Sequence, residues 1–177
     1  MDGDNPIKKA YASILEADFE RAIEWFEQAI REEPDNADYH YKLSVTFARS
    51  NRLGKAIEHA LRAKQLEPGS DVYSYHLDTL QAKLLMQDAQ KVLDGTDRTY
   101  LAVPLLTRAI ELDPLSVEAH MMLSAAYAAL QEYGKAVQMA NETLRLDPEH
   151  PDAKRLAEEY RQQLKMYLQT QQTIREI

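Results

Sequence analysis

The chain of 177 residues contains no cysteine, and this absence excludes several kinds of chemistry at once. Without thiols there are no disulfide bonds, no thiolate nucleophile and no thiolate metal ligands. The sequence also lacks any stretch of about 18 uncharged apolar residues, the minimum for a membrane-spanning helix. Its N-terminal residues have no basic segment followed by an apolar run, which a secretory signal would require. We therefore expect a cytoplasmic protein that does not insert into membranes.

Basic residues are in deficit, with 21 lysines and arginines against 29 aspartates and glutamates and a net charge of −8. Binding to DNA or RNA without sequence preference draws its affinity from the neutralisation of phosphates. The basic residues of this chain are scattered, with no basic run and no interleaved stacking aromatics. We expect no nucleic-acid partner.

Recognisable catalytic motifs are also missing. There is no glycine-rich phosphate loop and no His-Glu-x-x-His zinc helix. The five histidines are dispersed. Two of them, His40 and His120, occupy equivalent positions of the sequence repeat described below, which favours a packing role. We expect no catalytic residues, no metal and no cofactor, and thus a protein that is not an enzyme.

Four prolines mark a repeating unit. Pro34, Pro68, Pro114 and Pro148 close the phrases REEP, QLEP, ELDP and RLDP, at spacings of 34, 46 and 34 residues. The middle spacing is longer by twelve, which indicates an insertion in the third unit. A fixed period of this size is typical of a solenoid built from stacked helix pairs. The scarcity of glycine, five residues in all, suits an all-helical chain.

Small residues recur at a fixed phase within the unit. Ten positions are identical when Ala37–Ser70 is aligned with Val117–His150. An alanine stands twelve residues before every proline, and a second small residue stands five before it. Low-volume side chains at a constant phase allow two antiparallel helices to approach closely. The two sets are Ala22, Ala56, Ala102 and Ala136, and Ala29, Ala63, Ala109 and Thr143.

The repeated phrases resemble a known family, the tetratricopeptide repeat. Three segments, ADFERAIEWFEQAIREEP, RLGKAIEHALRAKQLEP and EYGKAVQMANETLRLDP, are similar to the second helix of that repeat. Two others, HYKLSVTFA and HMMLSAAYA, are similar to its first helix, with histidine in place of the family's tryptophan and serine in place of its glycine. The resemblance implies an all-α, right-handed α-solenoid of about four helix-turn-helix repeats with a C-terminal capping helix.

We expect one array over residues 1–177. Its predicted parts are repeat 1 with a short first helix (3–36), repeat 2 (37–70), repeat 3 with the insertion (71–116), repeat 4 (117–150) and a capping helix with a frayed tail (151–177). The insertion is predicted to lengthen the first helix of repeat 3 to 71–93, as part of a projecting helical hairpin with a turn at 94–99. The second helix is predicted over 99–112, where Pro104 either kinks it or delays its start. A tolerated length variant and a contact for a partner or a second copy both remain open as the role of this hairpin.

The resemblance also implies a binding surface, because the family's first helices line a concave groove. The positions that face this groove carry over to Tyr41, Lys42, Val45 and Arg49 in repeat 2, Tyr75, His76 and Thr79 in repeat 3, and Met121, Met122 and Ala125 in repeat 4. Aromatic and methionine side chains of this kind accept apolar anchors from a peptide or helix. The alternative is that the tyrosines and methionines belong to the core.

These observations predict a non-catalytic interaction module, a scaffold or adaptor that binds a peptide or helix of a partner protein. The alternative function is a dedicated cytoplasmic chaperone for a secreted or aggregation-prone client. Chaperone adaptors of the resembling family hold a C-terminal carboxylate with a clamp of lysine, asparagine and arginine. Here the matching positions carry Ile7, Tyr11, Lys42, Val72 and His76, which disfavours that role. The sequence leaves self-association open.

Overall fold

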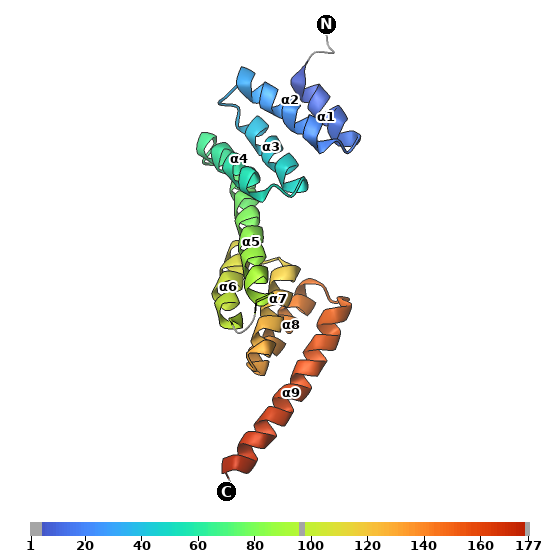
Figure 1. Cartoon of the computed structure of the whole chain (residues 1–177), viewed down its shortest axis with the longest axis vertical. Coiled ribbons are helices and arrows are strands. Elements are labelled where there is room, and N and C mark those ends of the chain that lie inside the picture. Colours follow the sequence, from blue (N-terminus) through green and yellow to red (C-terminus); the bar gives the residue numbers. More distant parts are fainter. Residues whose placement is uncertain (1–4, 96–97, 176–177) are drawn as a thin grey trace. The chain divides into compact units, whose positions relative to one another are not determined.

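The structure is a computed structural model that describes residues 5–95 and 98–175. In these residues the chain forms nine α-helices and one short 3₁₀ helix, η1, and no strand (Figure 1). The helices are α1 (Pro6–Leu15), α2 (Phe19–Glu32), α3 (Ala37–Arg49), α4 (Leu53–Leu66), α5 (Asp71–Leu93), η1 (Thr99–Leu101), α6 (Ala102–Leu112), α7 (Val117–Ala129), α8 (Tyr133–Leu146) and α9 (Pro151–Arg175). The nine helices correspond to four pairs and one terminal helix, so the predicted fold class is confirmed.

Helix starts are defined by short polar side chains. Asn5, Asp18, Asn36 and Ser116 each accept a hydrogen bond from a backbone N–H in the first turn of the helix that follows, at 2.9 to 3.2 Å. These N–H groups have no acceptor within the helix, so a capping oxygen stabilises the helix start. Pro6, the first residue of α1, has no N–H, but no helical hydrogen bond is lost because an N–H at this position would have no acceptor within the helix.

The turn inside three of the repeats has one backbone conformation. Ala17, Asn51 and Gln131 have φ angles of 58°, 57° and 62°, in the left-handed region. The next residue in each case donates its N–H to the carbonyl five residues earlier, at 2.9 Å. This hydrogen bond and the left-handed residue are the features of a Schellman helix end. The turn thus reverses the chain tightly enough for the second helix to pack on the first.

The alanines at the fixed phase lie where paired helices cross. Ala22, Ala56, Ala102 and Ala136 are fully buried. Next to them, the serine at the family's small-residue position ties the pair together, because Ser44 Oγ donates to the Ala56 carbonyl at 2.6 Å and Ser124 Oγ to the Ala136 carbonyl at 2.7 Å. Each hydroxyl satisfies its own donor without leaving a buried polar group unpaired.

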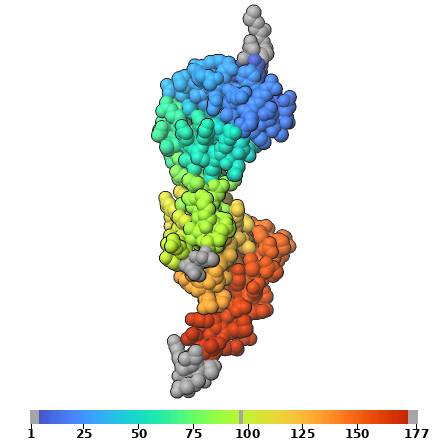
Figure 2. Space-filling model, viewed as in Figure 1, coloured from blue at the N-terminus to red at the C-terminus, as the bar shows by residue number. Residues whose placement is uncertain are grey.

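The chain divides into two compact units, residues 1–81 and 82–177, and the division falls inside α5. The core of the first unit is built around Phe26, Leu43 and Phe47, with Leu77 and Leu80 from the first part of α5. The core of the second contains Leu106 and Leu123, with Ala82, Met86 and Ala89 from the remainder of α5. In this second unit α9 lies against α8, as the red and orange surfaces show in Figure 2.

The insertion of the third repeat extends α5 to 23 residues, over the predicted range of 71–93. The second helix differs from the prediction, since residues 99–101 are a 3₁₀ turn and the α-helix begins only at Ala102. Pro104 is the third residue of α6, within the first turn, where a missing N–H removes no helical hydrogen bond. Of the predicted turn at 94–99, residues 96 and 97 lie outside the described part of the chain, as do residues 1–4 and the tail end at 176–177.

No helix within the described ranges combines the length and apolar content needed to cross a membrane.

Candidate functional site

A surface pocket between α3 and α5 collects four of the predicted groove residues. It has a volume of about 440 Å³ and is lined by Tyr41 from α3 and by Asp71, Val72, Tyr75, His76 and Thr79 from α5. We call it the α3/α5 pocket. All its residues belong to the first unit. The groove positions of two successive first helices therefore meet at one place.

Aromatic contacts shape the α3/α5 pocket. The Tyr41 ring packs edge-on against His76, with centroids 5.0 Å apart, and is tilted against Tyr73 at 5.2 Å. Such pairs hold rings in defined orientations. Tyr75 and Val72, by contrast, are 57% and 58% exposed. The pocket thus has a supported inner wall and an open apolar rim.

The hydrogen bonds of His76 identify its tautomer. The Ser44 hydroxyl already donates to the Ala56 carbonyl, so it must accept from His76, whose Nε2 lies 2.9 Å away. His76 therefore carries its proton on Nε2 and keeps Nδ1 as an acceptor. Burial lowers the pKa of His76, because it disfavours the charged form of the ring. His76 thus contributes a polar but uncharged ring near neutral pH, and Asp71 is the acidic residue of the lining.

The other predicted residues of α3 lie beside the pocket without lining it. Lys42 forms an ion pair with Asp38, and its ammonium group is 5.4 Å from the centre of the Tyr11 ring. Val45 is half-buried, and Arg49 is exposed. Helix α3 thus carries one positive charge that is ion-paired, on Lys42, and one, on Arg49, for which the described residues provide no ion-pair partner.

The three predicted residues of repeat 4 lie on α7, in the second unit. Met121 and Met122 are half-buried, and Ala125 is exposed. Met122 packs against the core of the second unit, so part of its surface is structural rather than available to a ligand.

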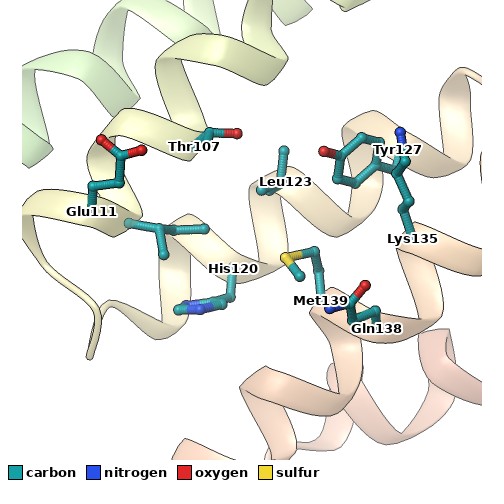
Figure 3. Close-up of a pocket in the computed structure, with 9 residues that line it drawn as sticks. Thr107, Glu111, His120, Leu123, Tyr127, Lys135, Gln138 and Met139 are labelled. Carbon is teal, nitrogen blue, oxygen red and sulfur yellow. The ribbon is translucent and has the colours of Figure 1, made fainter.

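A second pocket, which the sequence did not predict, lies between α6, α7 and α8 in the second unit (Figure 3). Its volume is about 450 Å³. We call it the α6–α8 pocket, and its lining residues are Thr107, Ile110, Glu111, His120, Leu123, Tyr127, Lys135, Gln138 and Met139. His120 was interpreted from the sequence as a packing residue, and Leu123 and Tyr127 lie with it in the lining. The three are largely buried, but they also form the floor of an open site.

A signal for this pocket does exist in the sequence. Repeats 2 and 4 are identical at His40/His120, but Met139 stands where repeat 2 has His59. A flexible thioether that replaces a planar ring at one repeat position leaves different space behind. That difference becomes informative only when the neighbouring rings are known.

Within the described residues, no group of three or more histidine, aspartate or glutamate side chains is placed so that it could hold a metal ion.

The helix pairs with their shared turn and serine contacts define a helical repeat protein. Two tetratricopeptide repeat models match the sequence, at residues 16–71 and 101–160, which together make up more than half of the chain. The chain belongs to the tetratricopeptide repeat family, whose members are generally non-catalytic interaction modules. No curated protein matches it.

Solved structures share the fold at low sequence identity. A crystal structure of MamA superposes with a TM-score of 0.52 and 21% identity, over 95% of this chain and 97% of that one. MamA 41-end from Desulfovibrio magneticus RS-1 gives a TM-score of 0.54 and 16% identity, over 98% of both chains. YrrB, described as a TPR protein with an unusual peptide-binding site, gives a TM-score of 0.50 and 21% identity, over 90% of this chain and 76% of that one.

Proposed function

We propose that this protein is a scaffold or adaptor that binds a peptide or helix of a partner protein, with the α3/α5 pocket as an anchor site. The observation that carries the proposal is that Tyr41, Tyr75, His76 and Thr79 line one pocket of about 440 Å³. Pockets of this size accommodate a side chain of a peptide ligand. The peptide-binding description of the related fold in YrrB supports the same class of ligand.

The chemistry of the site favours an anchor that is apolar with a polar edge. Val72 and Tyr75 supply an exposed apolar rim, and the Nδ1 atom of His76 is an acceptor. Arg49, which is exposed on the same helix as Tyr41, favours acidic residues that flank the anchor, whereas the charge of Lys42 is already paired with Asp38. We also propose partner contacts at Val45 on α3 in the first unit and, separately, at Met121, Met122 and Ala125 on α7 in the second unit, and a cytoplasmic array of four repeats and a cap over residues 1–177.

The experiment begins with capture of partners from the native cell and mass spectrometry, followed by affinity measurement on the purified pair. Tyr75→Ala should weaken binding at least about tenfold, because removal of an interface anchor costs about 2 kcal/mol or more. Helix content and thermal stability should stay unchanged, since the ring is exposed. The matched control is Tyr100→Ala, a tyrosine that is 59% exposed and lies outside the pocket. Equal effects of the two substitutions would contradict the proposed site.

Co-expression separates the scaffold from the chaperone. A scaffold's partner is soluble without this protein, whereas a chaperone's client becomes soluble only with it. If the partner precipitates when it is expressed alone and stays soluble when it is co-expressed with this chain, the protein is a chaperone and not a scaffold.

A further inference from the structure

Repeats 2 and 4 both have a histidine at one equivalent position, but the surroundings of the two histidines differ. Residues of the two repeats correspond at an offset of 80, so the two environments can be compared residue by residue. His40 on α3 corresponds to His120 on α7, Phe47 to Tyr127, and His59 on α4 to Met139 on α8. In each unit these residues lie where the first helix of a pair meets the second. The chain therefore contains two versions of one site.

In the first unit, a ring of the chain itself fills this site. His59 stacks on His40, with centroids 5.2 Å apart, and on Phe47 at 5.6 Å. His40 Nε2 lies 3.0 Å from the Pro34 carbonyl, which can only accept, so the proton of neutral His40 is on Nε2. His40 Nδ1 is then the acceptor, and His59 Nδ1–H donates to it at 3.0 Å. The occupant is a planar heteroaromatic ring with one N–H donor.

In the second unit, Met139 replaces the ring, and the site is the open α6–α8 pocket of about 450 Å³. His120 is only 5% exposed, and its Nδ1 lies 2.9 Å from the Ser116 carbonyl, which can only accept. Neutral His120 therefore keeps Nε2 as an acceptor, and none of the described residues donates to that atom. Because every buried side-chain nitrogen of the described residues has a partner, Nε2 must keep some exposed surface, and His120 lines the α6–α8 pocket. Figure 3 shows His120 on α7 beside Met139 and below Leu123.

The charges at the rim are already compensated. Lys135 forms an ion pair with Glu132 and lies 5.1 Å from the centre of the Tyr127 ring. Glu111 forms an ion pair with Arg108. The pocket therefore favours a neutral ligand over a charged one, since neither rim charge needs a new partner.

We propose that the α6–α8 pocket binds the side chain of a tryptophan from a partner polypeptide, with the indole N–H donating to His120 Nε2. The indole ring takes the place that the His59 ring holds in the first unit, against Leu123, Tyr127 and Met139. Its size fits, because an apolar cavity of about 150 Å³ is enough for benzene and this pocket is about three times larger. Indole is a donor only, which matches an acceptor that has no donor among the described residues.

The test uses the full chain and N-acetyl-tryptophanamide as the probe, with backbone and side-chain chemical shifts as the readout. The probe should perturb Thr107, His120, Tyr127 and Gln138. The 1-methylindole analogue should bind about tenfold more weakly, because it leaves the buried acceptor unpaired. Perturbations elsewhere, no binding at saturating probe, or equal affinity of the two compounds would overturn the proposal.

The variant Met139→His introduces into the second unit the ring that fills the corresponding site of the first unit. Met139→His should place a ring where His59 lies in the first unit and reduce probe binding at least about tenfold, since the space is then occupied. Met166→His, at an exposed methionine of α9, is the control and should bind like the parent chain. If Met139→His keeps its helix content and binds the probe normally, the proposal is wrong. If it unfolds, the methylated probe on the parent chain decides.

This inference is independent of the α3/α5 pocket. Tyr75→Ala should leave the tryptophanamide perturbations unchanged, and Met139→His should leave the Tyr75-dependent affinity unchanged for a peptide without tryptophan. The two experiments therefore test the proposed α3/α5 site and the proposed α6–α8 site separately.

Discussion

At the scale of single residues, the environment of each histidine decides its chemistry. His40 and His120 occupy the same repeat position, but one contacts a ring of the chain and the other borders an open pocket. His59 and His76 both carry a lowered pKa. Burial is the main cause for both, and for His59 the neighbouring His40 and Lys55 act in the same direction, against Glu58 and Glu27.

These shifts predict a loss of stability in mild acid. The folded-state pKa values of His59 and His76 lie below the ordinary 6.5, so the unfolded chain binds more protons as the pH falls below that value. The free energy of unfolding is then at its full value above pH 6.5 and decreases as the pH falls through the folded-state values. Denaturant titrations from about pH 7.5 to about pH 5.5 measure this decrease, within the range where histidine is the main titrating side chain.

The variant His59→Met should reduce the steepness of this decrease, because one of the two shifted groups is gone. The control is Met166→His, which adds an exposed histidine on α9 and should leave the slope nearly unchanged. An identical pH dependence in His59→Met and the parent chain would show that this ring does not contribute.

At the scale of the helices, close approach within each pair holds the repeats together. The fully buried alanines at one phase leave no room for a larger side chain, and the serine hydroxyl next to them bonds to the facing backbone. In a close-packed interior, a side chain that is larger by a few atoms lowers the stability of the fold. The same two contacts recur in repeats 2 and 4, so they belong to the repeat and not to one location.

Ala56→Leu should therefore destabilise the protein by about 1–3 kcal/mol, because the larger side chain overpacks the crossing of α3 and α4. Ala12→Leu, at an exposed position of α1, is the matched control and should change the free energy of unfolding by less than about 0.5 kcal/mol. Chemical denaturation of both variants gives the two values. A neutral Ala56→Leu would contradict the helix register described above.

At the scale of the whole molecule, the end of the repeats is covered by α9. Its first half packs on α8 through Ala153, Ala157 and Tyr160, which are buried, whereas Met166 and Leu168 in its second half are exposed. A terminal repeat needs such a cover because its last apolar face has no following repeat. The predicted capping role therefore applies to the first half of the helix.

Deletion of residues 152–177 should expose the apolar face of α8 and cause aggregation or loss of cooperative unfolding. Deletion of residues 169–177 alone should have little effect, since the described side chains there are exposed. Light scattering and thermal melts compare the two truncations. A monomeric 152–177 deletion with an unchanged melting temperature would show that α9 is not a cap.

The helix pairs could be predicted from the sequence, because prolines at a fixed period end helices and alanines at a fixed phase permit their contact. It also assigned Tyr41 of α3 and Tyr75, His76 and Thr79 of α5 to groove-facing positions of the repeat, and these four line the α3/α5 pocket, whereas the other predicted residues of α3 do not. It could not predict the α6–α8 pocket. Met139 and His59 are both acceptable at one repeat position, and only the packed neighbours show that the histidine ring fills the space and the methionine leaves it open. Cavities depend on the shapes of several side chains from different helices, and that information exists only in the tertiary structure.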